Sequence, residues 1–227
     1  MTDIGSDAEV EHSSRQEAAS GRPAAGEDPA KREQIIEGAH RIFMGMGFDA
    51  SSMSDIAREA GVSKGTLYVY FKNKEDLFAA MVQRQKSRVF EKLQEALGDK
   101  PLAEGLHDFG VAFAGYILSD NAIRAQRIVV GVLERMPEVT SSFFKVGPNH
   151  GPTVLANFLE RQVAAGRLVP LDDPVWAARQ FGDLCLAGLY RQRLFCEMAS
   201  APSSEAIERN VSAAVKMFLA VYGTDKA

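Results

Sequence analysis

The sequence predicts an all-α protein with a small N-terminal helical domain and a larger C-terminal one. Apolar residues recur at three- and four-residue spacing along most of the chain, which is typical of amphipathic helices. Ser, Asp or Asn residues precede these segments, and Gly or Pro follows them, as at helix starts and ends. Strand-type alternation of apolar and polar residues is scarce, and 227 residues are enough for a sizeable core.

The first 28 residues differ from the rest in composition. They are rich in Ser, Ala, Gly and Glu and contain few large aliphatic side chains, so they cannot bury enough apolar surface to offset their ordering entropy. Residues 1–30 hold seven acidic and two basic side chains, whereas the formal net charge of the whole chain is −4. We therefore expect a disordered acidic tail over residues 1–28 and a nearly neutral remainder.

Four closely spaced helix starts follow the tail and define a domain over residues 29–78. Asp and Pro together open the first helix, and a box of two serines and an aspartate opens the second. The fourth helix is long, runs over residues 74–97 and leads into the second domain. The expected N-caps are Asp28, Ser52, Ser63 and Asn73, and the expected stops are Gly45 with Gly47, Gly61 and Gly98.

The second domain, residues 79–227, also has a helical pattern throughout. Trp176 is expected to pack between helices. Cys185 and Cys196 lie eleven residues apart on one expected helix, about 16 Å along its axis, which is too far for a disulfide within the chain. Free thiols are typical of a reducing, intracellular compartment. The expected helices cover about 106–117, 121–134, 152–165, 173–196 and 204–222.

Residues 52–77 have the layout of a helix-turn-helix. Ala57 lies four residues before Gly61, and Leu67 lies six residues after it. A small residue lets the two helices approach closely, and glycine readily adopts the left-handed turn conformation. This layout predicts a DNA-reading unit whose second helix enters the major groove. The core beneath the two helices is expected to contain Leu67, Ile56, Ala60, Val62 and Tyr70.

The polar residues around the second helix are candidate DNA contacts. Lys64 can reach guanine acceptors, and Thr66 can reach a thymine methyl or a polar base edge. Gly65 has no side chain to hold the backbone away from the duplex. The hydroxyls of Tyr68 and Tyr70 and the ammonium of Lys74 are suited to backbone phosphates. The two tyrosines could instead be half-buried aromatic residues. The predicted DNA-binding residues are Ser52, Ser63, Lys64, Gly65, Thr66, Tyr68, Tyr70 and Lys74.

The run GFDASSMSDIAREAGVSKGTLYVYFKNKEDLF, residues 47–78, resembles the DNA-binding domain of the TetR/AcrR family of bacterial transcriptional regulators. Two departures are small: the Ser51–Ser52 pair stands where the family more often has Thr, and Met53 stands where Val or Ile is usual. Residues 124–195 look like the AefR-like type of C-terminal domain. The resemblance implies a regulator, most often a repressor, that binds double-stranded palindromic operator DNA as a homodimer.

In this family a small-molecule effector bound by the C-terminal domain changes the separation of the two reading helices. The last two long helices, about 173–197 and 204–222 here, usually form the dimer. The expected dimer-interface residues are Phe181, Leu184, Cys185, Gly188, Leu189, Val211, Val215 and Phe218. Polar residues that interrupt apolar stripes are candidates to orient a largely apolar effector: His107, Asp108, Tyr116, Gln126, Arg127, Asn157, Asp183 and Gln192.

Several classes of protein are disfavoured by the sequence. No catalytic motif is present, the four histidines have no Cys or His neighbour at ligand spacing, and we expect neither an enzyme nor a cofactor or metal. No apolar stretch approaches the roughly 20 residues of a membrane helix. We expect a cytoplasmic bacterial protein that is nucleoid-associated when bound to DNA. Two alternatives remain open: a constitutive DNA-binding repressor without an effector, and a helical small-molecule enzyme.

Overall fold

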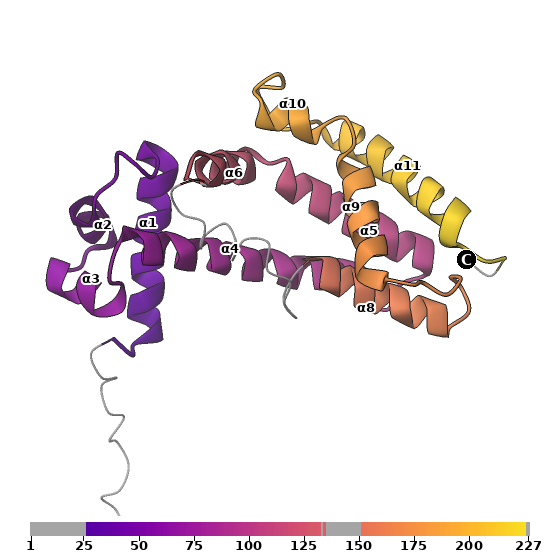
Figure 1. The fold of residues 1–227 in the computed structure, drawn as a ribbon, viewed down its shortest axis with the longest axis horizontal. Helices are drawn as coiled ribbons and strands as arrows, with labels where there is room; N and C mark the ends of the chain where they lie inside the picture. Colours follow the sequence, from indigo (N-terminus) through magenta and orange to yellow (C-terminus); the bar gives the residue numbers. More distant parts are fainter. Residues whose placement is uncertain (1–25, 133, 135–150, 226–227) are drawn as a thin grey trace, which may run out of the picture.

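A computed structural model describes residues 26–132, 134 and 151–225 of the chain. Within these ranges the secondary structure consists of ten helices and one isolated bridge between Leu168 and Gly223, which confirms the all-α fold. Figure 1 shows the long helix α4 running from a bundle of α1–α3 at one end to α8 at the other, with α10 and α11 on the opposite side of the molecule. The tail expected over residues 1–28 lies outside the described residues as far as residue 25.

The four N-terminal helices begin where their capping residues predict. The side chain of each cap accepts a hydrogen bond from a backbone N–H in the first turn, as at Asp28, Ser52, Ser63 and Asn73. Gly61 ends the second helix in the left-handed conformation, with φ 64°. The helices are α1 Pro29–Met46, α2 Met53–Ala60, α3 Lys64–Tyr70 and α4 Lys74–Leu97.

The C-terminal helices also lie close to their predicted positions, with one exception. The expected single helix over 173–196 is wrong, because the chain breaks after Leu186 and Gly188 adopts φ +76° before a short helix follows. A glycine takes this conformation without steric cost, which makes it a natural breaking point. The helices are α5 Leu102–Ile117, α6 Asp120–Val132, α8 Gly151–Ala164, α9 Pro174–Leu186, α10 Tyr190–Leu194 and α11 Ser204–Tyr222.

Two apolar cores hold these helices together, and α4 belongs to both. Its N-terminal half contributes Leu77, Phe78, Met81 and Val82 to the core of α1–α3, whereas its C-terminal half packs with α5, α8, α9 and α11. The last two turns of α6 also reach the N-terminal core through Val129 and Val132. The two domains therefore share helices, and a displacement of α4 or α6 would change the packing of the bundle of α1–α3.

The structure also bears on the expectations for the two cysteines, for Trp176 and for membrane-spanning helices. Cys185 is buried and Cys196 is exposed, and both are free thiols. Trp176 was expected between helices, but it is 57% exposed on the first turn of α9, so that prediction is wrong. None of the helices in the described residues is long and apolar enough to cross a membrane.

Candidate nucleic-acid interface

The turn between α2 and α3 is closed by backbone hydrogen bonds around Gly61. Its N–H lies near the carbonyls of Ala57 and Arg58, and the N–H of Val62 donates to the Ala57 carbonyl at 3.0 Å. Leu67 is completely buried beneath the two helices. The remaining members of the expected core, Ile56, Ala60, Val62 and Tyr70, belong to the same apolar cluster. The helix-turn-helix geometry predicted from the spacing of these residues is therefore present.

Helix α1 fixes this pair by approaching α2 very closely. A Cβ atom added to Gly38 would lie only 2.7 Å from the Ala60 Cβ and 2.9 Å from its backbone nitrogen. The Gln34 amide also donates to the Ala60 carbonyl at 2.6 Å, at the end of α2. These contacts hold the two helices as one rigid body.

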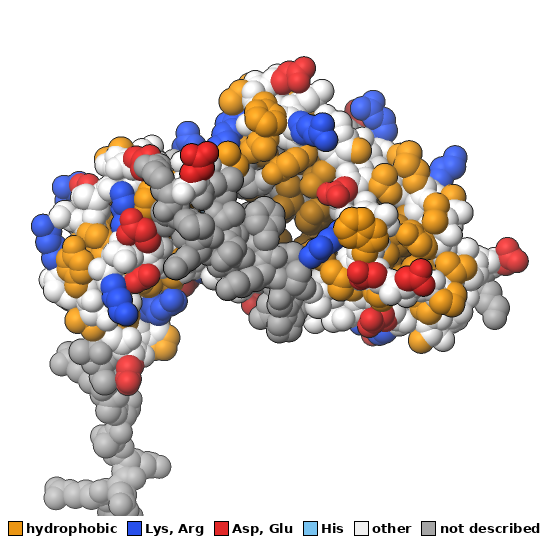
Figure 2. All heavy atoms as spheres, viewed as in Figure 1, with side chains coloured by type: hydrophobic (Ala, Val, Ile, Leu, Met, Phe, Trp, Pro, Cys, Tyr) orange, Lys and Arg blue, Asp and Glu red, His pale blue; other side chains and the backbone are white. Residues whose placement is uncertain are grey.

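One face of α3 is free to meet a partner. Ser63, Lys64, Gly65 and Tyr68 are exposed, and Tyr68 presents 53% of its surface to solvent. Thr66 is half-buried, and its exposed hydroxyl lies 2.8 Å from the Ser63 hydroxyl, so each hydroxyl can still turn toward a ligand. Seven residues at 1.5 Å per residue make a helix about 10 Å long, close to the width of the DNA major groove. Figure 2 shows Lys and Arg side chains around this end of the molecule.

Lys74 has a different environment from the one expected. Its ammonium donates to the carbonyls of Phe48 at 2.7 Å and Ser51 at 3.0 Å, and it lies 4.3 Å from the centre of the Phe48 ring. Lys74 therefore ties the start of α4 to the loop between α1 and α2. Sequence reasoning missed this role because the contacts span more than 20 residues along the chain.

Two further predicted DNA contacts also have structural roles. The Ser52 hydroxyl caps α2 by accepting from the Asp55 N–H at 3.2 Å, and it faces the Asp55 carboxylate. Tyr70 is half-buried against the N-terminal core, as one of the two readings of this residue allowed. Ser52 remains exposed at the start of α2, so the N-terminal end of that helix is open to a phosphate.

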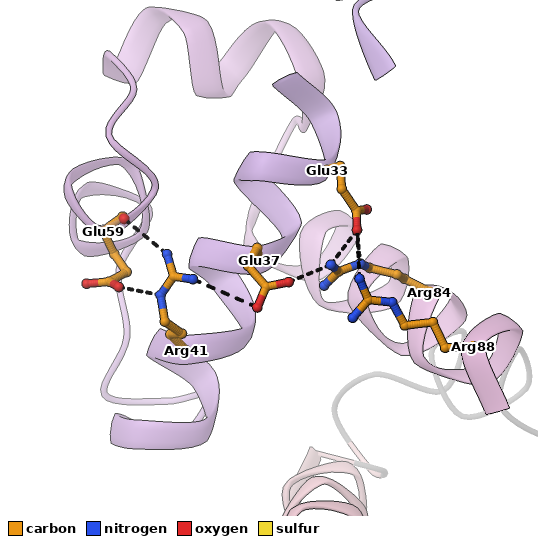
Figure 3. Close-up of polar contacts among 6 residues, drawn as sticks. All are labelled: Glu33, Glu37, Arg41, Glu59, Arg84 and Arg88. Atoms are coloured by element: carbon orange, nitrogen blue, oxygen red, sulfur yellow. Dashed lines mark hydrogen bonds and ion pairs between the residues drawn. The ribbon is translucent and has the colours of Figure 1, made fainter. Parts of the chain in front are cut away.

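A chain of ion pairs crosses the back of the domain from α4 to α2, and the sequence analysis did not anticipate it (Figure 3). Arg84 of α4 pairs with Glu33 and Glu37 of α1, and Arg41 of α1 pairs with both Glu37 and Glu59 of α2. The hydrogen bond from Arg84 holds the pKa of the Glu37 carboxyl below its ordinary value. The four-residue spacing of Glu33, Glu37 and Arg41 on one helix face was the available signal.

Four of the eight candidate effector residues have polar partners within the protein. His107 pairs with Glu208 at 2.8 Å, and Asp108 pairs with Lys100. Gln126 accepts from the Tyr190 hydroxyl, whereas Arg127 donates to the Leu194 carbonyl. Their polarity is thus largely explained by partners within the protein. Of the other four, Asn157 and Asp183 are exposed, and Tyr116 and Gln192 are half-buried. Among the eight candidates, only Asn157 and Arg127 line one of the two hollows described next.

Two open hollows mark the surface of the C-terminal domain. The first, of about 450 Å³, lies between α4 and α8 and is lined by Phe90, Gln94, Leu97, Val154, Asn157 and Arg161, among others. The second, of about 380 Å³, lies at the start of α6 beside α10. Both are open to solvent.

The residues expected at the dimer face differ in their burial within one protomer. Phe181, Cys185, Val211 and Phe218 are buried within a single protomer, where they join α9 and α11 to α5. Burial also raises the pKa of the Cys185 thiol to about 12, which makes it unreactive. Leu184, Leu189 and Val215 are half-buried, and Gly188 is exposed. The open apolar side chains on these two helices are instead Trp176, Met217 and Val221, of which Val221 is 68% exposed.

Comparisons with known proteins agree with this geometry. Residues 35–81 match the family of bacterial regulatory proteins of the tetR type, and residues 104–224 match the AefR-like transcriptional repressor C-terminal domain. The chain belongs to the TetR family. The expected AefR-like type of C-terminal domain is confirmed, and so is the expectation that the chain is not an enzyme, because TetR-family members are DNA-binding transcriptional regulators.

Relatives and solved structures give the same family. The flavonoid-responsive regulator FrrA is 34% identical, with a TM-score of 0.69 over 87% of this chain and 100% of that one. A putative TetR-family regulator from Mesorhizobium loti has a TM-score of 0.78 and 25% identity over 86% of this chain and 98% of that one. The fatty acid metabolism regulator protein of Bacillus subtilis is 36% identical over 33% of this chain, and the match spans 38% of the relative's own length. For the regulator YhgD of the same organism the match spans 51% of this chain and 65% of the relative.

Proposed function

We propose that this TetR-family protein is a repressor that binds a palindromic operator as a homodimer and leaves it when a small molecule binds. The observation that carries the proposal is the free face of α3, on which Lys64, Gly65 and Tyr68 are exposed while Leu67 anchors the helix from behind. A helix held rigidly on one side and open on the other is what major-groove reading requires.

The DNA contacts divide into two classes. Lys64 and Thr66, in the first turn of α3, reach base edges, and the exposed Tyr68 reaches a phosphate. The contribution of Lys74 is indirect, because its ammonium is committed to the carbonyls of Phe48 and Ser51 and it positions the loop before α2. Ser52 and Ser63 place the first turns of α2 and α3 by capping them.

Dimerisation follows from the small size of the reading surface. One helix of seven residues contacts too few base pairs for specific recognition, whereas two copies related by a two-fold axis read half-sites about 34 Å apart. We place the interface on the outer sides of α9 and α11, around Trp176, Met217 and Val221. Open apolar side chains on two helices that pack against each other are typical of a protein contact. In Figure 2 hydrophobic side chains lie open along this part of the molecule.

Effector release is favoured over constitutive binding by the two hollows and by the shared helices. α4 and α6 belong to the N-terminal core and also line the hollows, so a ligand that displaces either helix changes the position of α3. Moving such a two-state equilibrium decisively takes roughly 5 kcal/mol of differential affinity. The name of the structural relative FrrA, a flavonoid-responsive regulator, agrees with this mode of control.

A salt-titrated gel shift tests the proposal. The duplex is the intergenic DNA that flanks the gene for this protein, and a scrambled duplex of the same composition is the control. We expect specific retardation whose logarithmic affinity falls linearly with the logarithm of salt concentration. Equal affinity for both duplexes at all salt concentrations, or an absence of any shift, would contradict specific operator binding.

A further inference from the structure

Three arginines surround the hollow of about 380 Å³ beside the start of α6. Arg124 and Arg127 lie on α6, Arg193 lies on α10, and Asp120, Asn121 and Ile123 complete most of the wall. A polar hollow with so many guanidinium groups is not explained by the DNA interface or by the proposed dimer face, since it belongs to neither.

The one carboxylate in this wall is already neutralised. Arg193 is only 2% exposed, and its guanidinium donates to the Asp120 carboxylate and to the carbonyls of Leu118 and Met198. These bonds make Arg193 a structural element that joins α5, α6 and the chain after α10. The lining of the hollow therefore retains the positive charges of Arg124 and Arg127.

Those two arginines are held by carbonyl groups and not by acids. Arg124 donates to the Met44 carbonyl at 2.8 Å, and Arg127 donates to the carbonyls of Leu194, at 2.9 Å, and Arg193. Neither forms an ion pair with a carboxylate among residues 26–132, 134 and 151–225. A guanidinium has five N–H donors, so each retains donors for a ligand while its position is fixed.

We propose that this hollow binds a small organic carboxylate, with Arg124 and Arg127 as its charged ligands. The planar fork of arginine binds carboxylates through two parallel hydrogen bonds, and two such groups with no acidic partner favour an anion over a neutral molecule. Ala199, which is exposed and lines the same hollow, offers one apolar contact for the carbon skeleton. This differs from the largely apolar effector expected from the sequence.

The position of the hollow links it to DNA binding. Arg124 holds the last turn of α1 through Met44, and the same helix α6 places Val129 and Val132 in the N-terminal core. A carboxylate that binds the spare donors of Arg124 and Arg127 links α6 more tightly to the last turn of α1 and to α10, and so changes the position of α6 against the bundle of α1–α3. The effect on operator affinity rests on the proposed function, whereas ligand binding itself does not, and the two effects are thermodynamically reciprocal.

Titration calorimetry on the full-length protein without DNA tests the site. The probes are benzoate and hexanoate, and their uncharged counterparts benzamide and hexanol are the controls, together with inorganic phosphate. We expect both carboxylates to bind and Arg127→Gln and Arg124→Gln each to weaken this binding about tenfold, as the loss of one charge-assisted pair predicts. Arg191→Gln, which removes an exposed arginine of α10 outside the hollow, should bind as the wild type does.

Four results would overturn the proposal: no binding of either carboxylate, equal binding of the uncharged counterparts, binding of phosphate alone, or unchanged affinity in both glutamine variants. Circular dichroism and urea unfolding report whether each variant folds. If Arg127→Gln does not fold, Arg127→Lys replaces it, because lysine keeps the positive charge but lacks the planar guanidinium that binds a carboxylate through two hydrogen bonds. Wild-type affinity for the carboxylates in a folded Arg127→Lys variant would also contradict the assignment. A gel shift with benzoate is measured separately, so failure of operator binding remains distinguishable from failure of the site.

Discussion

Two lysines ten residues apart, Lys64 and Lys74, lie in different environments in this domain. Lys64 is exposed in the first turn of the reading helix, whereas Lys74 is half-buried and bonded to two carbonyls. An exposed ammonium can contribute to the free energy of DNA binding. An ammonium that is hydrogen-bonded within the protein contributes to the free energy of folding instead. The two residues therefore provide a clean separation of binding from stability.

For Lys64→Gln we expect a loss of operator affinity of roughly 1–3 kcal/mol if the side chain reads a base edge. A phosphate contact would instead reduce the salt slope by about one. Fluorescence anisotropy over a range of salt concentrations measures both quantities. Lys92→Gln, which removes an exposed lysine of α4 far from α3, is the matched control. Wild-type affinity and slope in Lys64→Gln would remove this residue from the interface.

For Lys74→Met we expect a loss of about 1–2 kcal/mol in the free energy of unfolding, because two carbonyls lose a charged donor. Urea denaturation followed by circular dichroism measures this change. Lys72→Met removes the neighbouring exposed lysine and should alter stability by less than about 0.5 kcal/mol. Equal stability of the two variants would show that the Lys74 contacts contribute nothing to folding.

Glu37 gives the domain a pH dependence of defined sign. Its pKa is lowered in the folded state, chiefly by the hydrogen bond from Arg84, so its ionised form stabilises the fold. This contribution is present above the ordinary pKa of glutamate and is lost as the pH falls through the lowered folded value. Unfolding free energies of wild type and Glu37→Gln should differ at neutral pH and converge in acid, once the pH has fallen below the lowered folded pKa of Glu37. A difference that persists unchanged in acid would rule out this linkage.

At the scale of helices, the close approach of α1 to α2 depends on the absence of a side chain at Gly38. Gly38→Ala places a methyl group against the backbone of Ala60, which cannot move aside, so we expect a loss of about 1–3 kcal/mol and weaker DNA binding. Gly45→Ala in the same helix meets nothing within 4 Å and should be neutral or stabilising by up to about 1 kcal/mol. Thermal unfolding distinguishes them; equal midpoints would refute the close-packing argument.

Helix starts were predictable because their causes are local. Asp28, Ser52, Ser63 and Asn73 lie within three residues of the N–H groups that they cap, so the sequence displays both partners. The break at Gly188 was missed because a glycine inside an apolar stripe is also tolerated within a helix. The helix-turn-helix was predicted from local spacing together with the motif over residues 47–78, whereas the Lys74 contacts depend on how α4 meets a distant loop.

Interfaces were harder to predict for a different physical reason. An apolar stripe on α9 or α11 indicates that a face is buried, but not whether it is buried by the same protomer or by a second one. Phe181 and Phe218 pack within the protomer, and Met217 and Val221 remain open. Polar residues pose the same problem, since His107 appeared free in the sequence but pairs with Glu208, a hundred residues away.

For the whole molecule, the proposed two-fold assembly depends on that open face. Met217→Glu together with Val221→Glu places two charges in the contact and should convert dimers into monomers with at least tenfold weaker operator binding. Met46→Glu adds a charge at an exposed apolar residue of α1 and should leave the dimer intact. Sedimentation equilibrium gives the masses. A stable dimer in the double variant would place the interface elsewhere.

The central claim is that two α3 helices, held at a fixed separation by the dimer, read one DNA duplex together. Selection of tight binders from a random-sequence duplex library tests it most directly. The account predicts a palindromic consensus whose half-sites are about one or more helical turns apart, bound by pairs of protomers. A consensus with a single half-site, or no enrichment of any sequence, would contradict it.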